Sequence, residues 1–250
     1  MQSFTFHNPT QIVFGRDKVA ELANLVPASA KVLILYGGAS AEKTGTLAEV
    51  RAALGEREVQ EFGGIEPNPT YETLMKAALQ VQRDKIDFLL AVGGGSVIDG
   101  TKFVAAAACF DGEPWDILLQ HGSNVTRALP FGTVLTLPAT GSEMNNGAVV
   151  TRKATHTKLA FMSRHVFPVF SVLDPTKTFT LPPKQIANGI ADAFVHTVEQ
   201  YLTYPVQGLA QDRFAEGLLQ TLIEIAPKAL AEPDDYDTRA NLMWTATLAL

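Results

Sequence analysis

The segment at 87–108, DFLLAVGGGSVIDGTKFVAAAA, constrains the fold more than any other part of the sequence. An apolar run ends at three glycines and Ser96, and a stretch with the apolar spacing of a helix follows directly. A strand that leads straight into a helix is typical of the crossover units that build a parallel sheet, and such apolar strands are usually covered on both faces. The segment therefore predicts an α/β fold.

The same alternation of short β-branched runs and longer helical patterns extends from about Thr10 to Leu173. The runs that we expect to form strands lie at 11–14, 31–36, 59–62, 87–92, 133–137 and 168–173. The part of the sequence before about residue 180 therefore reads as an α/β domain, which we place at 1–180.

The pattern becomes entirely helical after this part of the chain. Prolines at 182 and 183 are predicted to begin a helix that continues to Tyr201, because proline is tolerated in a first helical turn. Pro205 then interrupts the helical pattern, and two further helical patterns follow. We predict an all-helical domain over 181–250. Its last segment, RANLMWTATLAL, carries no C-terminal helix signal, so we expect a sequence that is cut within this domain.

Composition excludes several classes of partner. The 250 residues include 46% hydrophobic and 18% charged residues, as expected for a chain with a large core. Twenty Lys and Arg against 26 Asp and Glu give a net charge of −6 without a basic run, so we expect no nucleic-acid partner. Cys109 is the single cysteine, which agrees with a reducing compartment. The sequence shows neither a signal peptide nor an apolar run long enough to span a membrane, so we expect a cytoplasmic protein without a membrane partner.

The glycine-rich bend after the strand at 87–92 is a candidate phosphate site. Glycines let the backbone approach an anion and adopt positive φ, while free N–H groups at a helix start stabilise negative charge. The bend matches neither the GxGxxG pattern nor the P-loop pattern, and Lys102 is not placed like a P-loop lysine. A tight strand-to-helix turn without a ligand is the alternative.

Polar residues follow two other predicted strands. Thr136, Thr140 and Asn145 lie in TVLTLPATGSEMN, where hydroxyl and amide groups suit ribose or phosphate oxygens but also favour turns and helix caps. The sequence YGGASAEKTG occupies the place where dinucleotide domains often carry an acidic residue for the ribose. The small residues found there could admit a 2′-phosphate, which favours NADP over NAD; they are Gly37, Gly38 and Ser40.

A carboxylate and an imidazole share one face of the predicted helix at 183–201. Asp192 and His196 are four residues apart, and both groups suit Zn²⁺ or Fe²⁺. Gly189, about one turn earlier, would leave room for a ligand or a cofactor ring. The alternative is a hydrogen bond that satisfies both side chains. Since a catalytic site usually needs about three protein ligands, the others must come from elsewhere.

The motifs together resemble the iron-containing alcohol dehydrogenase family, in its branch of NADPH-dependent aldehyde reductases and butanol dehydrogenases. The resemblance rests on FGGIEPNPTYETL, LLAVGGGSVIDGTKF, LTLPATGSE, VLDP and LPPKQIANGIADAFVHTVEQY and covers the whole sequence. It implies an α/β dinucleotide-binding domain and a helical domain with the active site between them. It also implies that Asp192 and His196 are the first two metal ligands, while two further histidines belong to a later helical region.

The resemblance also implies cofactor contacts. Gly94, Gly95 and Ser96 would hold the pyrophosphate with Asp99 nearby, and Gly38 and Ser40 would face the 2′-phosphate. The residues expected along the ribose and nicotinamide are Thr136, Thr140, Asn145 and Lys158.

The expected activity is metal-dependent hydride transfer between NADP(H) and short-chain aldehydes or alcohols, with Fe or Zn as the metal, in a homodimer. Two alternatives remain open. One is an enzyme similar to dehydroquinate synthase, which would need basic residues for a phosphorylated substrate that are not evident here. The other is a non-catalytic NADP-binding chain that lacks a complete metal site.

Overall fold

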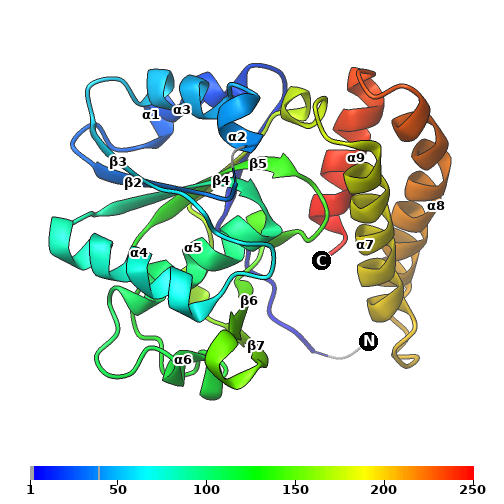
Figure 1. The fold of residues 1–250 in the computed structure, drawn as a ribbon. Helices are drawn as coiled ribbons and strands as arrows, with labels where there is room; N and C mark the ends of the chain where they lie inside the picture. The colour runs from blue at the N-terminus through cyan, green and yellow to red at the C-terminus, as the bar shows by residue number, and fades with distance from the viewer. Residues whose placement is uncertain (1–2, 39) are drawn as a thin grey trace.

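The computed structural model describes residues 3–38 and 40–250, in which a parallel sheet lies between two layers of helices (Figure 1). All neighbouring strands of the sheet are parallel, which confirms the predicted α/β class. The strand order is β1 (Gln11–Phe14), β8 (Phe170–Leu173), β5 (Phe131–Leu137), β4 (Phe88–Gly94), β2 (Lys31–Tyr36) and β3 (Glu58–Phe62).

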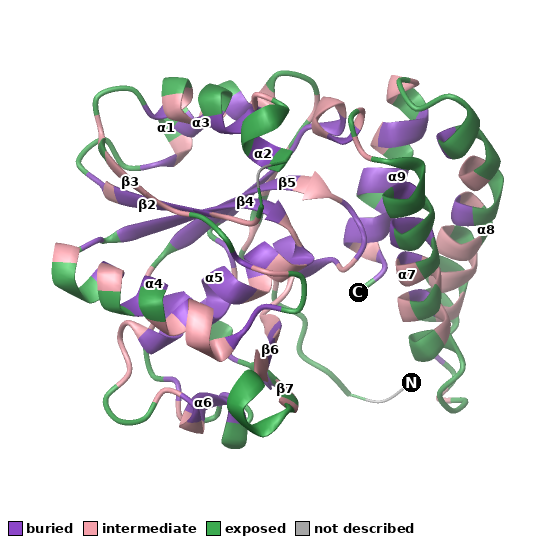
Figure 2. Cartoon of the chain, in the orientation of Figure 1, coloured by how far each residue is buried: buried purple, intermediate pink, exposed green. Residues whose placement is uncertain are grey.

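The helices cover both faces of the sheet, and its four central strands, unlike the two edge strands, are mostly buried (Figure 2). On one face lie α4 (Tyr71–Asp84) and α5 (Gly95–Ala107), and on the other α1 (Leu22–Leu25), α2 (Ser40–Lys43) and α3 (Thr46–Leu54). Helix α4 turns one apolar stripe to the core at the i, i+3, i+4, i+7 spacing of an amphipathic helix. The short elements are η1 (Lys18–Glu21), α6 (Asp116–Leu119), η2 (Ser142–Met144), η3 (Lys153–Thr155), η4 (Arg164–Val166) and η5 (Pro175–Thr178).

The six predicted strands all exist, with shifts at some ends. β4 continues through Gly93 to Gly94, and β8 begins only at Phe170, two residues after Pro168, which has no N–H to donate to a ladder. The prediction missed an antiparallel hairpin, β6 (Gly147–Arg152) and β7 (Thr157–Met162), which packs beside α5.

Three long helices form the last part of the chain beside the sheet: α7 (Pro183–Tyr201), α8 (Leu209–Ala231) and α9 (Tyr236–Leu248). Helix α7 begins at the predicted proline and ends at the predicted residue. These helices share an apolar cluster, including Ile186, Leu222 and Leu242, that is separate from the two clusters on the faces of the sheet. The cluster supports a domain division near residue 181, which stays a prediction.

The strand order places a crevice between β2 and β4. From the carboxyl end of β2 the chain continues to β3 on one side, and from the carboxyl end of β4 it continues to β5 on the other side. Connections that diverge in this way separate the loops at the carboxyl ends of the two strands, and open α/β sheets bind ligands at such a point. The loop after β2 and the glycine bend after β4 therefore flank the expected ligand position.

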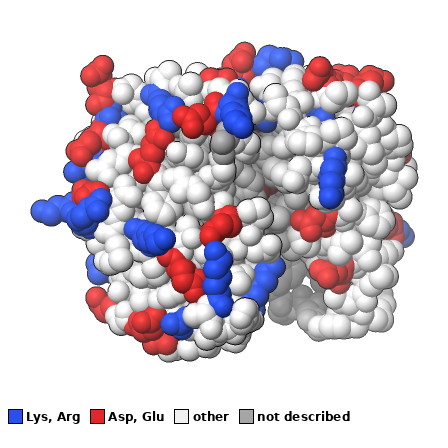
Figure 3. All heavy atoms as spheres, viewed as in Figure 1, with Lys and Arg blue, Asp and Glu red and all other residues white. Residues whose placement is uncertain are grey.

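Two further properties of the structure bear on possible partners: the length and polarity of its helices and the distribution of its charged side chains. Within the described ranges, the helices are too short or too polar to cross a membrane. Figure 3 shows basic and acidic side chains intermixed on one face of the molecule.

Candidate functional site

Two adjoining pockets lie between the carboxyl ends of the strands and α7. The bend pocket, of about 410 Å³, includes Gly37, Gly38 and the stretch 94–97. The hairpin pocket, of about 640 Å³, includes residues of β6 and β7 together with His196. Both pockets are lined by Gly95, Ser96, Thr140 and Asp192, so they form one continuous cleft. The structure thus brings the glycine bend and the carboxylate–imidazole pair to the same open space.

The three glycines of the bend are needed for close packing and not for positive φ. The described glycines with positive φ do not include Gly93, Gly94 or Gly95, which corrects the conformational part of the sequence argument. A Cβ on Gly93 would lie 2.6 Å from Val97, and a Cβ on Gly95 would lie 2.4 Å from Oγ1 of Thr140. Gly94, Gly95 and Ser96 line the bend pocket, so the N-terminus of α5 is accessible to a ligand from the cleft.

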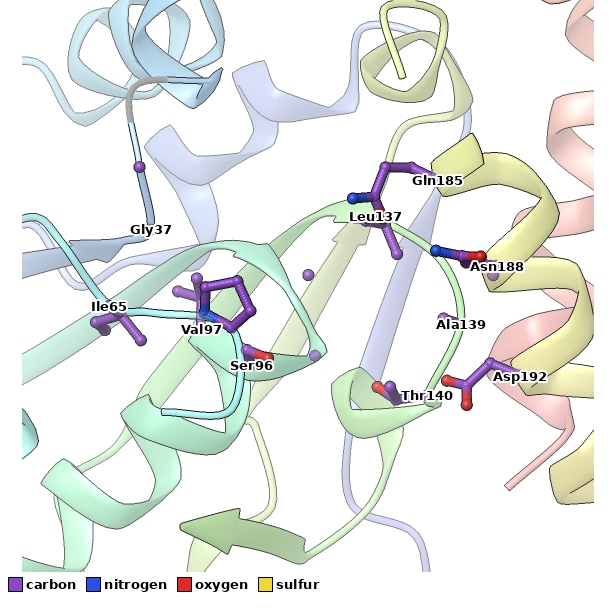
Figure 4. A pocket seen from close by; sticks show the side chains of 15 residues that line it. Gly37, Ile65, Ser96, Val97, Leu137, Ala139, Thr140, Gln185, Asn188 and Asp192 are labelled. Atoms are coloured by element: carbon purple, nitrogen blue, oxygen red, sulfur yellow. The ribbon is translucent and has the colours of Figure 1, made fainter. Parts of the chain in front are cut away.

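Helix α7 forms the opposite wall of the cleft. Gln185, Asn188 and Asp192 lie on its side that faces the strand ends (Figure 4). Gly189 allows this approach, since a Cβ there would lie 2.6 Å from the backbone oxygen of Pro138. Gly189 thus lets α7 approach the loop after β5, and it also lines the bend pocket, so the expectation that it leaves room for a ligand or cofactor ring nearby stays a prediction.

Asp192 and His196 do not form the hydrogen bond that the alternative interpretation required. Oδ1 of Asp192 and Nε2 of His196 are 3.8 Å apart, too far for a hydrogen bond. This separation is about 0.4 Å longer than the roughly 3.4 Å between two ligand atoms around a tetrahedral zinc ion. Nδ1 of His196 is buried and has no partner among the described residues. The donor pair fits a divalent metal.

The described residues supply only part of a metal site. Residues 3–38 and 40–250 contain no group of three or more His, Cys, Asp and Glu side chains that could hold a metal ion. Cys109 lies half-buried after the end of α5, where burial raises the pKa of its thiol. It is therefore not positioned as a thiolate ligand. Asp192 and His196 would need at least one further protein ligand from outside the described residues.

A buried polar network stands behind the hairpin pocket. Lys102 is fully buried, and its Nζ donates to Oγ of Ser142 at 2.9 Å, to Oδ1 of Asn145 at 2.8 Å and to the Gly147 carbonyl at 2.7 Å. Asp99, one turn earlier on α5, accepts hydrogen bonds from Oγ of Ser142 at 2.6 Å and from the backbone N–H of Val149 at 2.9 Å. Burial raises the pKa of Asp99, and Lys102 partly offsets this effect.

A second connection joins the glycine bend to the hairpin. The Lys158 ammonium donates to Oδ1 of Asn68 at 2.8 Å, and the backbone N–H of Asn68 donates to Oγ of Ser96 at 3.2 Å. Both Lys158 and Asn68 line the hairpin pocket. A cation therefore stands at the side of the cleft away from α7.

Most of the residues predicted from the sequence lie together in this cleft, although their roles stay predictions. The two exceptions are Ser40, which begins α2 and is exposed, and Thr136, near the end of β5; neither lines either pocket. The predicted residues that do line the cleft are Gly37, Gly38, Gly94, Gly95, Ser96, Asp99, Thr140, Asn145, Lys158, Asp192 and His196. Sequence reasoning missed Asn68, Gln185 and Asn188, which resemble ordinary turn or helix-surface residues, and the partners of Lys102.

The burial of Lys102 has a consequence for stability against pH. Burial lowers the pKa of Lys102 to about 8 from its ordinary 10.5, while Asp99 and Glu143 act in the opposite direction. Between these two pH values the unfolded chain binds a proton that the folded chain does not, so this group makes the free energy of unfolding rise with pH. The rise amounts to about 3 kcal/mol by pH 10.5 and is lost again as the pH falls to 8.

Urea unfolding at pH 7.5, 9 and 10 would measure this effect, with Lys102→Met as the reference. We expect the wild-type free energy of unfolding to increase relative to that of the variant across this range. Other groups, such as Tyr71, titrate in both proteins, so their contributions cancel in the difference. Parallel curves would show that Lys102 keeps an ordinary pKa.

Comparisons with protein families give two matches. A family model described as iron-containing alcohol dehydrogenase matches residues 9–175. A second model, described as the C-terminal part of the Fe-containing alcohol dehydrogenase family, matches residues 186–250.

Individual relatives and structures agree with these models. The chain is 60% identical to the NADPH-dependent aldehyde reductase YqhD of Escherichia coli and 46% identical to a probable NADH-dependent butanol dehydrogenase of Bacillus subtilis, over its whole length in both cases. It spans about 65% of the length of these curated relatives. The crystal structure of E. coli YqhD superposes with a TM-score of 0.98 over 99% of this chain and 64% of that chain, at 60% identity. NADH-dependent butanol dehydrogenase A of Thermotoga maritima gives a TM-score of 0.94 at 39% identity, over 100% of this chain and 63% of that chain.

Proposed function

Since the chain belongs to the iron-containing alcohol dehydrogenase family, we propose that its full-length protein reduces short-chain aldehydes with NADPH in a metal-dependent reaction. The observation that carries the proposal is the continuous cleft, in which the glycine bend, Lys158, Asp192 and His196 are all accessible. An anion site and a pair of metal-ligating side chains in one cleft are the two elements that this chemistry requires.

We propose that the cofactor extends along the cleft from Gly38 to His196. The N-terminus of α5, at Gly94, Gly95 and Ser96, holds the pyrophosphate, because its N–H groups and dipole favour negative charge. The open space at Gly37 and Gly38 receives the 2′-phosphate side of the adenosine. The nicotinamide end then lies in the hairpin pocket, where Asp99, Thr140, Asn145 and Lys158 orient it. The cofactor contacts of Ser40 and Thr136, which do not line the cleft, stay predictions.

Asp192 and His196 would hold the metal, which is Fe or Zn. When bound, the metal supplies Lewis-acid polarisation of the aldehyde carbonyl, and NADPH supplies the hydride. The chain itself holds both reactants in one crevice and thereby lowers the entropic part of the barrier.

Measurements of NADPH binding, metal content and NADPH oxidation test the proposal. The full-length gene product should bind NADPH, contain a divalent metal and oxidise NADPH when short aldehydes such as butanal are added. A protein with bound metal and NADPH but without turnover of any aldehyde would contradict the proposed reaction.

The second candidate is a chain that binds NADP without catalysis. The lack of a third ligand among the described residues favours it for the 250 residues alone. NADPH titration and metal analysis of this chain separate the two candidates, because the second predicts binding of NADPH without a stoichiometric metal. A cytoplasmic location and a homodimer stay part of the proposal for the full-length protein.

Preference for NADPH over NADH should depend on Gly38. A Cβ at Gly38 would meet no other atom within 4 Å, so an aspartate fits there without a clash. We expect Gly38→Asp to weaken NADPH binding by about tenfold or more and to leave NADH binding nearly unchanged, because only NADPH carries the 2′-phosphate that would lie beside the carboxylate. Gly38→Asn is the matched uncharged control. If aspartate and asparagine weaken NADPH equally, charge at this position does not select the cofactor.

A further inference from the structure

The buried ammonium of Lys102 lies behind the wall of the cleft and does not line either pocket. It is one of two charged residues in α5, most of whose other residues are buried and apolar. Two of its acceptors lie in the chain between β5 and β6 and the third is the first residue of β6, at sequence separations of 40, 43 and 45 residues. A single side chain therefore fixes a whole loop to the helix that begins at the glycine bend.

The three acceptors are themselves part of the hairpin pocket. Ser142, Asn145 and Gly147 all line it, as does Asp99, to which Ser142 donates its hydroxyl proton. Asn145 also accepts the backbone N–H of Gly147 at 3.0 Å through the oxygen that contacts Lys102. These bonds determine which way the Ser142 hydroxyl and the Asn145 amide point. Hydrogen bonds to a charged donor are stronger than neutral ones, and burial strengthens them further.

We propose that Lys102 is a positioning residue, whose buried charge sets the wall of the hairpin pocket that orients the nicotinamide end of the cofactor. The inference rests on the proposed function. Lys102 touches neither cofactor nor substrate. It acts through Ser142 and Asn145, and the Asp99 carboxylate balances its charge from the same helix.

Loss of the Lys102 ammonium should affect the two ends of the cofactor differently. Lys102 braces the hairpin pocket, whereas the bend pocket is formed by the loop after β2 and by the first turn of α5. Loss of the ammonium should therefore disturb binding at the nicotinamide end and leave the adenosine and pyrophosphate end unchanged. A general loss of folding would instead affect both ends together.

The test compares NADPH with 2′-phospho-ADP-ribose, which has the same adenosine and pyrophosphate but no nicotinamide. In the full-length gene product, Lys102→Met should bind NADPH about tenfold more weakly and bind the fragment as the wild type does. With butanal as substrate, kcat should fall about 100-fold, as expected when a reacting group is misplaced by about an ångström. Thr101→Val is the matched control, because Thr101 is equally buried on α5 and its hydroxyl bonds only to the carbonyl of Val97.

Each result decides the inference. Equal affinities of wild type and Lys102→Met for NADPH, or an equal loss for NADPH and the fragment, would overturn it. If the methionine variant does not fold, Lys102→Gln, which keeps donors without the charge, is measured in the same way. A wild-type protein that binds neither NADPH nor the fragment would contradict the proposed function itself, and the inference with it.

Discussion

Replacement of His196 by alanine is expected to remove metal-dependent turnover from the full-length protein and to leave NADPH binding almost unchanged. His196 lines the hairpin pocket only, whereas the glycine bend is on the opposite wall of the cleft. Polarisation of the carbonyl by a metal is worth several kcal/mol, so its loss should reduce kcat by about 10³-fold or more. Metal content, NADPH affinity and kcat are measured on the same preparation.

The matched control for this variant is His7→Ala. His7 is exposed near the start of the described chain and lines neither pocket, so its replacement should change none of the three quantities. Full turnover by the His196 variant in metal-free buffer would contradict the assignment of this side chain.

Replacement of Gly95 by alanine should weaken NADPH binding and leave the metal content unchanged, the reverse of the pattern expected for the His196 variant. The added Cβ would lie 2.4 Å from Oγ1 and 2.7 Å from Cγ2 of Thr140, so the first turn of α5 or the loop after β5 must move. Loss of about two hydrogen bonds to phosphate would weaken NADPH binding by roughly 10² to 10³-fold. NADPH titration measures this effect, and metal analysis shows whether the other wall is intact.

The same substitution at Gly217 serves as the control for Gly95→Ala. Gly217 lies in α8, where a Cβ would meet nothing within 4 Å. Alanine there should raise the free energy of unfolding by about 0.5–1 kcal/mol through helix propensity and leave NADPH affinity as it is. Normal NADPH binding by Gly95→Ala would mean that the bend is only a tight turn.

The sequence was sufficient to predict the elements whose pattern is local. The apolar runs of β2 and β4 and the prolines before α7 each identify an element within a few neighbouring residues. The spacing of Asp192 and His196 was also informative, because four residues in a helix put two side chains on one face. Parallel strands bring their carboxyl ends to one edge, and this explains why residues from three loops meet in the cleft.

The features that were missed depend on distant contacts. The β6–β7 hairpin contains a polar turn around His156, and its burial alternates incompletely along both strands, so its pattern resembles a loop. The partners of Lys102 lie at least 40 residues away in the sequence, so no local pattern identifies them. The phosphate role of the bend glycines stays a prediction, and only the positions of Val97 and Thr140 reveal that packing, and not positive φ, requires glycine there.

The most direct test of the account measures whether the metal side chains and the nicotinamide share one crevice. Mn²⁺ bound to the full-length protein would accelerate the nuclear relaxation of nearby protons of bound NADP⁺. We predict strong relaxation of the nicotinamide protons, much weaker relaxation of the adenine protons, and loss of the effect in Asp192→Ala. If Mn²⁺ and NADP⁺ bind together and both ends of the cofactor relax equally slowly, the two sites are separate and the account is wrong.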